Sequence, residues 1–286
     1  MKVQDRLTQK KKVIDDGLRH ILSQEDSLLY RAMRHTVLAG GKRFRPLLAL
    51  SSGECFGVKQ DVMLPFACGL ELIHNYSLIH DDLPFMDDDD FRRGQPSCHK
   101  AYGEDIALLA GDSLLTLAFE VIAQAPVRKR LAPKKEQIIK EISHFAGARG
   151  MVGGHLMDIT LSPEEITEED LHELILRKTG ALIIASVKTG AILGEASTFQ
   201  LDAMVEYGRN IGIAFQIRDD ILDSIEEEKE NQSRPSYISF YGREEAENRL
   251  KRYIADGISA FDKTSLQSEE LRYLAHRLLS LNRNKK

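Results

Sequence analysis

Apolar residues recur every three or four positions along most of the chain, which is the spacing of one face of an α-helix. The stretch that contains Leu64, Ala67 and Leu70 is an example. Long runs that alternate between apolar and polar residues, as β-strands do, are missing from the sequence. The pattern therefore predicts an all-α protein.

The strongest helical stretches are at about 27–39, 44–56, 62–83, 106–124, 135–158, 200–224 and 243–260. We expect a further long helix to begin near Glu168 and to run past Lys188. Its start is indicated by Thr167 and Asp170, which have the spacing of a capping box. Since no Pro-, Gly- or Ser-rich linker divides these stretches, we expect one domain, residues 1–286, of about ten or more helices.

Composition and charge narrow the class of protein. The 286 residues are 42% hydrophobic, and the net charge of −5 comes with basic residues spread along the chain, so no nucleic-acid-binding surface is indicated. The N-terminus lacks the apolar core of a signal peptide, and no run reaches the roughly 18 apolar residues of a membrane span. The three cysteines suit a reducing compartment. We expect a cytoplasmic protein with no membrane span.

The segment 78–94, LIHDDLPFMDDDDFRRG, places six aspartates within ten positions. His74 and Asp81 share one face of the predicted helix, and Pro84 should end it. A bend after Pro84 would return Asp87 to the side of Asp81. Carboxylates crowded at a helix C-terminus repel one another and the negative end of the helix dipole. A divalent cation bound between the carboxylates would replace this repulsion by attraction.

A second acidic cluster lies in GIAFQIRDDILD, residues 212–223. Gln216, Asp219 or Asp220, and Asp223 fall on one stripe of an otherwise apolar helix. An isolated pair of aspartates is usually a solvated helix end. Two such clusters in apolar helices favour a different interpretation, because oxygen ligands without His or Cys suit Mg²⁺ shared with substrate phosphates. The sequence predicts a diphosphate held through Mg²⁺.

Basic residues stand next to these clusters. GGKRFRP, residues 40–46, offers three of them before an apolar helix, and Arg92 and Arg93 follow the first acidic cluster. Arginine suits phosphate oxygens, although a single basic residue is more often a surface charge. GGK lacks the spacing of a Walker A loop, so a nucleotide site is not indicated. Together with the aspartates, the basic residues indicate a second anion.

Five segments occur in the order GGKRFRP, LIHDDLPFMDDDDFRRG, LAGDSLL, RKTGAL and FQIRDDILD. In this order they resemble the trans-isoprenyl diphosphate synthases, over about residues 40–223, and look most like the bacterial farnesyl diphosphate synthase (geranyltranstransferase) branch. The resemblance implies an isoprenoid synthase fold, a bundle of mainly antiparallel helices around a central cavity, usually in a homodimer. It also implies condensation of isopentenyl diphosphate with dimethylallyl and geranyl diphosphate.

The same resemblance implies roles for individual residues. Three Mg²⁺ ions would be bound on the allylic diphosphate by Asp81 and Asp87 from one wall and by Asp219 and Asp223 from the other. The residues implied to contact that diphosphate are Arg92, Lys178, Thr179 and Gln216. Those implied to hold isopentenyl diphosphate are Lys42, Arg45, His74 and Arg93. The catalytic set would be Asp81, Asp87, Lys178 and Asp219. Without the resemblance, His74 would be interpreted as a core histidine and Thr179 as a helix residue that bonds its own backbone.

Product length is predicted from the helix before the first aspartates. Tyr76 and Ser77 lie five and four positions before Asp81, below the expected metal site and towards the closed end of the cavity. A bulky Tyr76 should stop the tail at fifteen carbons, as farnesyl diphosphate. The alternative is that Tyr76 is ordinary core packing, in which case the product could be geranyl or geranylgeranyl diphosphate.

Two segments depart from the family pattern. The family has a loop with two lysines and several glycines after the second motif, where this chain has SIEEEKENQSRPSY; Arg234 would take the place of the second lysine. His155 stands where the family generally has Gln. This loop is shorter than that of the family and is acidic. It is the best support for an alternative interpretation, that the protein is a binding subunit that has lost catalytic turnover. A class I terpene cyclase is the other rival, but the sequence DDILD favours the synthase.

Overall fold

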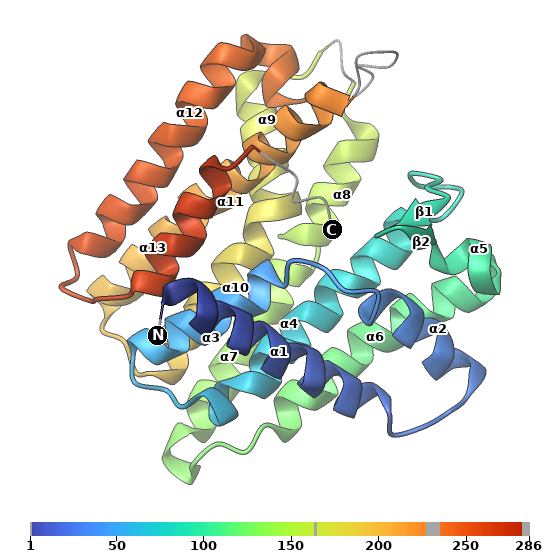
Figure 1. Ribbon diagram of the computed structural model, residues 1–286, viewed down its shortest axis with the longest axis horizontal. Helices are drawn as coiled ribbons and strands as arrows, with labels where there is room; N and C mark the ends of the chain where they lie inside the picture. The colour runs from blue at the N-terminus through green and yellow to red at the C-terminus, as the bar shows by residue number, and fades with distance from the viewer. Residues whose placement is uncertain (1, 163–164, 227–234, 282–286) are drawn as a thin grey trace.

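The computed structural model describes residues 2–162, 165–226 and 235–281, and it is built from helices (Figure 1). The first are α1 (Val3–Leu22), α2 (Leu28–Val37), α3 (Phe44–Cys55), α4 (Gln60–Asp81), α5 (Cys98–Tyr102), α6 (Glu104–Gln124) and α7 (Ala132–Ala146). The others are α8 (Met151–Thr160), α9 (Glu168–Ile175), α10 (Ala181–Leu193), α11 (Thr198–Glu226), α12 (Tyr237–Asp262) and α13 (Glu269–His276). The predicted all-α class is confirmed.

The remaining regular structure is short. Two-residue strands, β1 (Phe91–Arg92) and β2 (Gln95–Pro96), form an antiparallel hairpin directly after the first acidic cluster. Single 3₁₀ turns cover Lys129–Leu131 and Arg277–Leu279. The hairpin is the only β-structure in the described part of the chain, and it matters because it carries Arg92.

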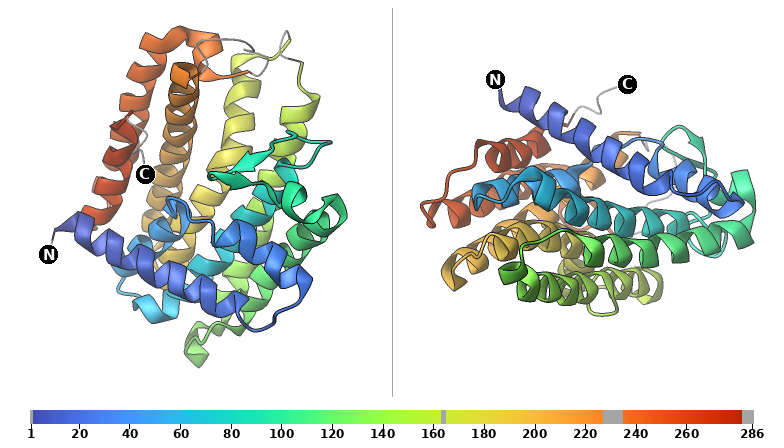
Figure 2. Two further views of the ribbon diagram at one scale, coloured as in Figure 1. Left: turned by 45° about the vertical axis from the view of Figure 1, so that its right-hand side comes forward. Right: turned by 90° about the horizontal axis from the view of Figure 1, so that it is seen from below.

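The hydrophobic core lies between the central helices. α4 packs against α3 and α6, α10 packs against α3 and α11, and α11 packs against α12. Leu48, Phe66, Leu182 and Ile217 are fully buried at these contacts. Figure 2 shows α1 on the outer side of α3 and α4. Burial of this apolar surface is the main stabilising contribution to the bundle.

The helix predicted to begin near Glu168 begins there, as α9. Thr167 and Asp170 form the predicted capping box: Oγ1 of Thr167 accepts from the Asp170 N–H, and Oδ2 of Asp170 accepts from the Thr167 N–H at 3.0 Å. The helical path runs past Lys188, but Leu176–Gly180 is wound as a π-helix. This wider turn, which was not predicted, carries Lys178 and Thr179. Such π-turns are frequent at functional sites.

The single helix predicted over 135–158 is wrong. The chain forms two helices, α7 and α8, because glycines interrupt the helical backbone between them. Gly150 has φ −132° and ψ −124°, and a Cβ atom there would lie 2.0 Å from the carbonyl oxygen of Phe145. Helices α1 and α13 were not predicted either; the apolar stripe of α1 is narrow and is surrounded by charged residues.

Helices α4 and α6 are each long and apolar enough to cross a membrane by length and composition. The core helices of soluble proteins can be equally long and apolar. In α4, 72% of the most apolar stretch of 18 residues is buried in the bundle. The corresponding share for α6 is 33%, and two of its apolar side chains, Leu108 and Leu109, are exposed. The absence of a membrane span stays a prediction.

Candidate active site

The first acidic cluster folds back on the end of α4, as predicted. The helix ends at Asp81, and the backbone N–H of Asp87 donates to the carbonyl of Asp81 at 2.8 Å. The turn between them is closed by hydrogen bonds from the N–H groups of Met86 and Asp88 to the carbonyl of Leu83. Asp81 and Asp87 are therefore held together by the backbone.

The carboxylate of Asp81 contacts helix α8. Its Oδ1 atom lies 3.0 Å from Nδ1 of His155, and each of the two side chains is 15% exposed. His155 is the residue at which the sequence departs from the family pattern. In this fold it is the direct partner of a predicted metal ligand.

Arg92 is engaged by carboxylates of its own segment. Its Nε atom donates to Oδ1 of Asp82 at 2.9 Å, and Nη2 donates to Oδ2 of Asp89 at 2.7 Å. Burial raises the pKa of Asp82, and the Arg92 guanidinium partly opposes that shift. Arg92, predicted to contact a diphosphate, thus also holds the acidic loop to the end of α4.

The π-turn brings Lys178 and Thr179 to two different helices. Nζ of Lys178 lies 2.5 Å from Oδ2 of Asp158 on α8, and Oγ1 of Thr179 donates to Oε1 of Gln216 on α11 at 2.7 Å. The close approach of α8 requires Gly154, because a Cβ atom there would lie 2.3 Å from the backbone nitrogen of Lys178. Thr179 does not bond its own backbone in the manner of a helix residue.

The second acidic cluster divides into an inner and an outer part. Nε2 of Gln216 donates to Oδ1 of Asp220 at 2.9 Å, and the N–H of Tyr237, the first residue of α12, donates to Oδ2 of Asp220 at 2.8 Å. Burial raises the pKa of Asp220 to about 6. Asp220 therefore anchors Gln216 and the start of α12.

Asp219 and Asp223 form the outer part. The carboxylate of Asp219 is 33% exposed and lies 3.1 Å from Nη1 of Arg218, whose Nε donates to the carbonyl of Ser280. Asp223 is exposed one turn further along α11. Both can therefore be reached from solvent, as a metal–diphosphate complex would require.

A cationic cluster lies between α3, α4 and the β-hairpin. The side chain of Arg45 is 8% exposed, and among the described residues its buried Nε atom has no hydrogen-bond partner. Burial, and then the charge of Arg45 and that of Arg93, lower the pKa of His74 well below its usual value. Neighbouring buried guanidinium groups repel each other. An anion bound between them would stabilise this arrangement.

Two members of the basic segment 40–46 behave differently from Arg45. Arg43 is fully paired: it donates to Asp15 and to Glu71 at 2.8 Å each, and to the carbonyl of Val37 at 2.6 Å. Lys42 is exposed. Of the three basic residues, Arg45 and Lys42 are the two for which the resemblance implies a substrate contact.

The residues predicted to set product length lie on α4. Tyr76 is 6% exposed, and its ring centroid lies 5.7 Å from that of His80 in an edge-to-face arrangement. Nε2 of His80 lies 3.1 Å from the carbonyl of Leu108 on α6. Ser77 donates to the carbonyl of His74 at 2.9 Å. Tyr76 is thus a buried aromatic residue that packs on His80, an α4 residue that contacts α6.

Sequence reasoning missed two members of the site. Asp158 and Asp220 each hold a predicted substrate-contacting residue in place; Asp158 was assigned no role, and Asp220 was considered only as an alternative to Asp219 on the acidic stripe. For Asp158 a signal was present, since it stands three positions after His155 and so shares its helix face. Arg234, the predicted substitute for the loop lysine, lies outside the described residues.

Comparisons with known proteins place this arrangement in a family. The polyprenyl synthetase family matches residues 26–235. A geranylgeranyl diphosphate synthase of Cyanophora paradoxa is 41% identical over 84% of this chain and 83% of its own. A farnesyl diphosphate synthase of Bacillus subtilis is 38% identical over 93% of each chain. A crystal structure described as an FPP/GFPP synthase from Zymomonas mobilis superimposes with a TM-score of 0.88 and 32% identity, covering 97% of this chain and 99% of that one.

Proposed function

The chain belongs to the polyprenyl synthetase family and is a prenyltransferase, and from this premise we propose that it makes farnesyl diphosphate. The substrates are isopentenyl diphosphate and, in turn, dimethylallyl and geranyl diphosphate. The relatives include both farnesyl and geranylgeranyl diphosphate synthases. The choice of product therefore rests on Tyr76.

One observation supports a single diphosphate site for this reaction: a continuous series of contacts joins the two acidic clusters. Asp81 on α4 contacts His155 of α8, and Asp158 of α8 contacts Lys178 of the π-turn. Thr179, the next residue, bonds Gln216 of α11, one turn before Asp219 and Asp220. The same helices pack against the buried core, so the order of contacts is fixed by the fold. This supports two carboxylate walls around one diphosphate.

The donor set fits magnesium. Asp81, Asp87, Asp219 and Asp223 offer only carboxylate oxygens, which are the ligands that Mg²⁺ prefers. These residues would hold the ions, three in number by family resemblance, together with the allylic diphosphate. When bound, Mg²⁺ supplies charge stabilisation to a departing diphosphate.

The basic and polar side chains complete the assignment. Lys178, Arg92, Thr179 and Gln216 orient the allylic diphosphate, and Lys178 places a positive charge where negative charge develops as the allylic C–O bond breaks. Lys42, Arg45, His74 and Arg93 hold isopentenyl diphosphate, whose double bond attacks the allylic carbon. A proton then leaves, and the released pyrophosphate is its acceptor. The apolar walls exclude water from the cation.

The proposal extends to assembly and location. We infer a homodimer, supported by the uncovered apolar surface of α6, where Leu108 and Leu109 are 43% and 51% exposed. A contact with a second copy of the chain would cover these two adjacent side chains. Cytoplasmic location is part of the same proposal, and it rests on the sequence alone.

The test is incubation of the purified protein with Mg²⁺, labelled isopentenyl diphosphate and either dimethylallyl or geranyl diphosphate. Farnesyl diphosphate as the main product supports the proposal in full. Geranyl or geranylgeranyl diphosphate would keep the prenyltransferase and overturn the product assignment. Cyclic hydrocarbons would instead indicate a terpene cyclase. Binding without product would indicate a subunit that has lost turnover, the reading that the departing loop sequence favours.

A further inference from the structure

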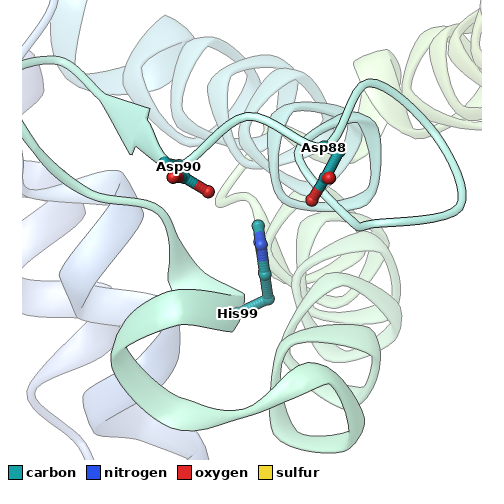
Figure 3. Close-up of side chains that lie close together, drawn as sticks. All are labelled: Asp88, Asp90 and His99. Atoms are coloured by element: carbon teal, nitrogen blue, oxygen red, sulfur yellow. The ribbon is translucent and has the colours of Figure 1, made fainter.

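A second group of ligand-type side chains lies beside the first acidic cluster. One carboxylate oxygen each from Asp88 and Asp90 and one ring nitrogen of His99 all lie within 4.8 Å of one another. Figure 3 shows the His99 ring pointing from α5 into the space between the two carboxylates. None of the three residues belongs to the set assigned above to Mg²⁺ or to a diphosphate.

The histidine has an unused nitrogen. His99 is only 6% exposed, and within the part of the chain that the structure describes its buried Nε2 atom has no hydrogen-bond partner. Its Nδ1 atom lies 3.1 Å from Oγ of Ser97. A buried polar atom without a partner is unfavourable. A histidine with one nitrogen fixed by a hydrogen bond and the other left over has the arrangement of a metal ligand.

The ammonium group of Lys100 lies beside the two carboxylates. Nζ of Lys100 lies 2.8 Å from Oδ1 of Asp90 and 4.0 Å from Oδ1 of Asp88, and the lysine side chain is 42% exposed. The two carboxylates thus attract positive charge from the helix that carries His99. An exposed ammonium group can swing into solvent at little cost. A doubly charged ion that also gains the imidazole nitrogen would displace it.

We propose that Asp88, Asp90 and His99 bind one divalent transition-metal ion of the zinc class. An imidazole nitrogen with two carboxylates favours Zn²⁺ over Mg²⁺, which prefers oxygen ligands. Water would complete the coordination. The ion would tie the acidic loop, including its neighbour Asp87, to α5. This inference does not depend on the proposed prenyl transfer.

The test is titration with Zn²⁺ alone, followed by calorimetry, on full-length protein that carries Asp81→Asn and Asp219→Asn. Those two substitutions weaken the main acidic site, and no diphosphate is present, so failure of the proposed reaction would not affect the result. Added His99→Asn or Asp88→Asn should weaken zinc binding roughly tenfold or more. Lys100→Met should strengthen it, because the competing ammonium group is gone.

Matched controls are His20→Asn and Asp202→Asn, which change exposed residues of the same types elsewhere. They should leave zinc affinity unchanged. Melting curves identify any variant that fails to fold, and Asp88→Asn, at an exposed position, keeps the test usable if His99→Asn is unstable. The proposal is overturned if His99→Asn and Asp88→Asn bind zinc as the controls do, or if Lys100→Met leaves the affinity unchanged.

Discussion

Nδ1 of His155 lies 3.0 Å from Oδ1 of Asp81, so the residue that departs from the family pattern directly orients a predicted metal ligand. Glutamine has an amide N–H that can make a similar contact. We therefore expect His155→Gln to retain most activity and His155→Ala to lower kcat/KM roughly tenfold or more, because the Asp81 carboxylate loses its fixed orientation. Steady-state rates over a range of Mg²⁺ concentrations check this.

The Mg²⁺ concentration needed for activity shows whether His155 orients Asp81 or only supports the packing of the helices. If His155 orients Asp81, His155→Ala should need more Mg²⁺ for half-maximal activity, while its melting temperature stays close to that of the starting protein. An unchanged Mg²⁺ requirement with a large loss of stability would show that His155 only packs α8 against α4.

Lys178 is predicted to act on the reacting diphosphate, and the chain provides a matched control for it. Lys178 pairs with Asp158 at 2.5 Å, and Lys188, on the following helix, pairs with Glu141 at 2.8 Å with similar exposure. We expect Lys178→Met to lower kcat roughly a hundredfold, since one charge aimed at the departing group is lost. Lys188→Met should reduce stability and leave kcat nearly unchanged. Equal losses of kcat in the two variants would contradict the role of Lys178.

Local sequence features predicted much of the site. The return of Asp87 to Asp81 follows from Pro84 ending a helix and from a short turn after it, so positions a few residues apart were enough. The capping box at Thr167 is equally local. These features depend on backbone chemistry within about one turn of the helix.

The rest depends on contacts between distant segments. Nothing near Lys178 indicates that Asp158 will be its partner, because the break at Gly150 and the close approach at Gly154 first have to set the position of α8. The π-turn likewise has no recognisable signature in the sequence. The pairing of Arg92 with Asp82 and Asp89 required knowledge of the hairpin geometry. Such features follow from packing of the whole bundle.

Asp220 should make stability depend on pH. Burial raises its pKa from 3.8 to about 6 in the folded chain, so the folded state favours the protonated acid. Its contribution to stability is complete below the unfolded value and is lost as the pH rises through about 6. We expect the stability advantage of the unmodified protein over Asp220→Asn to fall by about 3 kcal/mol as the pH rises from below 3.8 to above 6.

Urea unfolding without metal or substrate, at a series of pH values, measures this difference. Other titrating groups contribute to both proteins, so they cancel when one free energy of unfolding is subtracted from the other. A difference that stays constant would show that folding does not raise the pKa of Asp220, and one that grows with pH would show that folding lowers it.

Tyr76 tests the product assignment. Its ring is buried beside His80, which contacts α6, and it lies about one turn and a half before Asp81. If the ring closes the cavity, Tyr76→Ala should open room for a further five-carbon unit, and geranylgeranyl diphosphate should increase at the expense of farnesyl diphosphate. Tyr76→Phe keeps the ring and should keep the product, which makes it the control. Chromatography of the dephosphorylated alcohols measures the ratio; if Tyr76→Ala still makes only the fifteen-carbon product, other helices set the limit and Tyr76 is ordinary core packing.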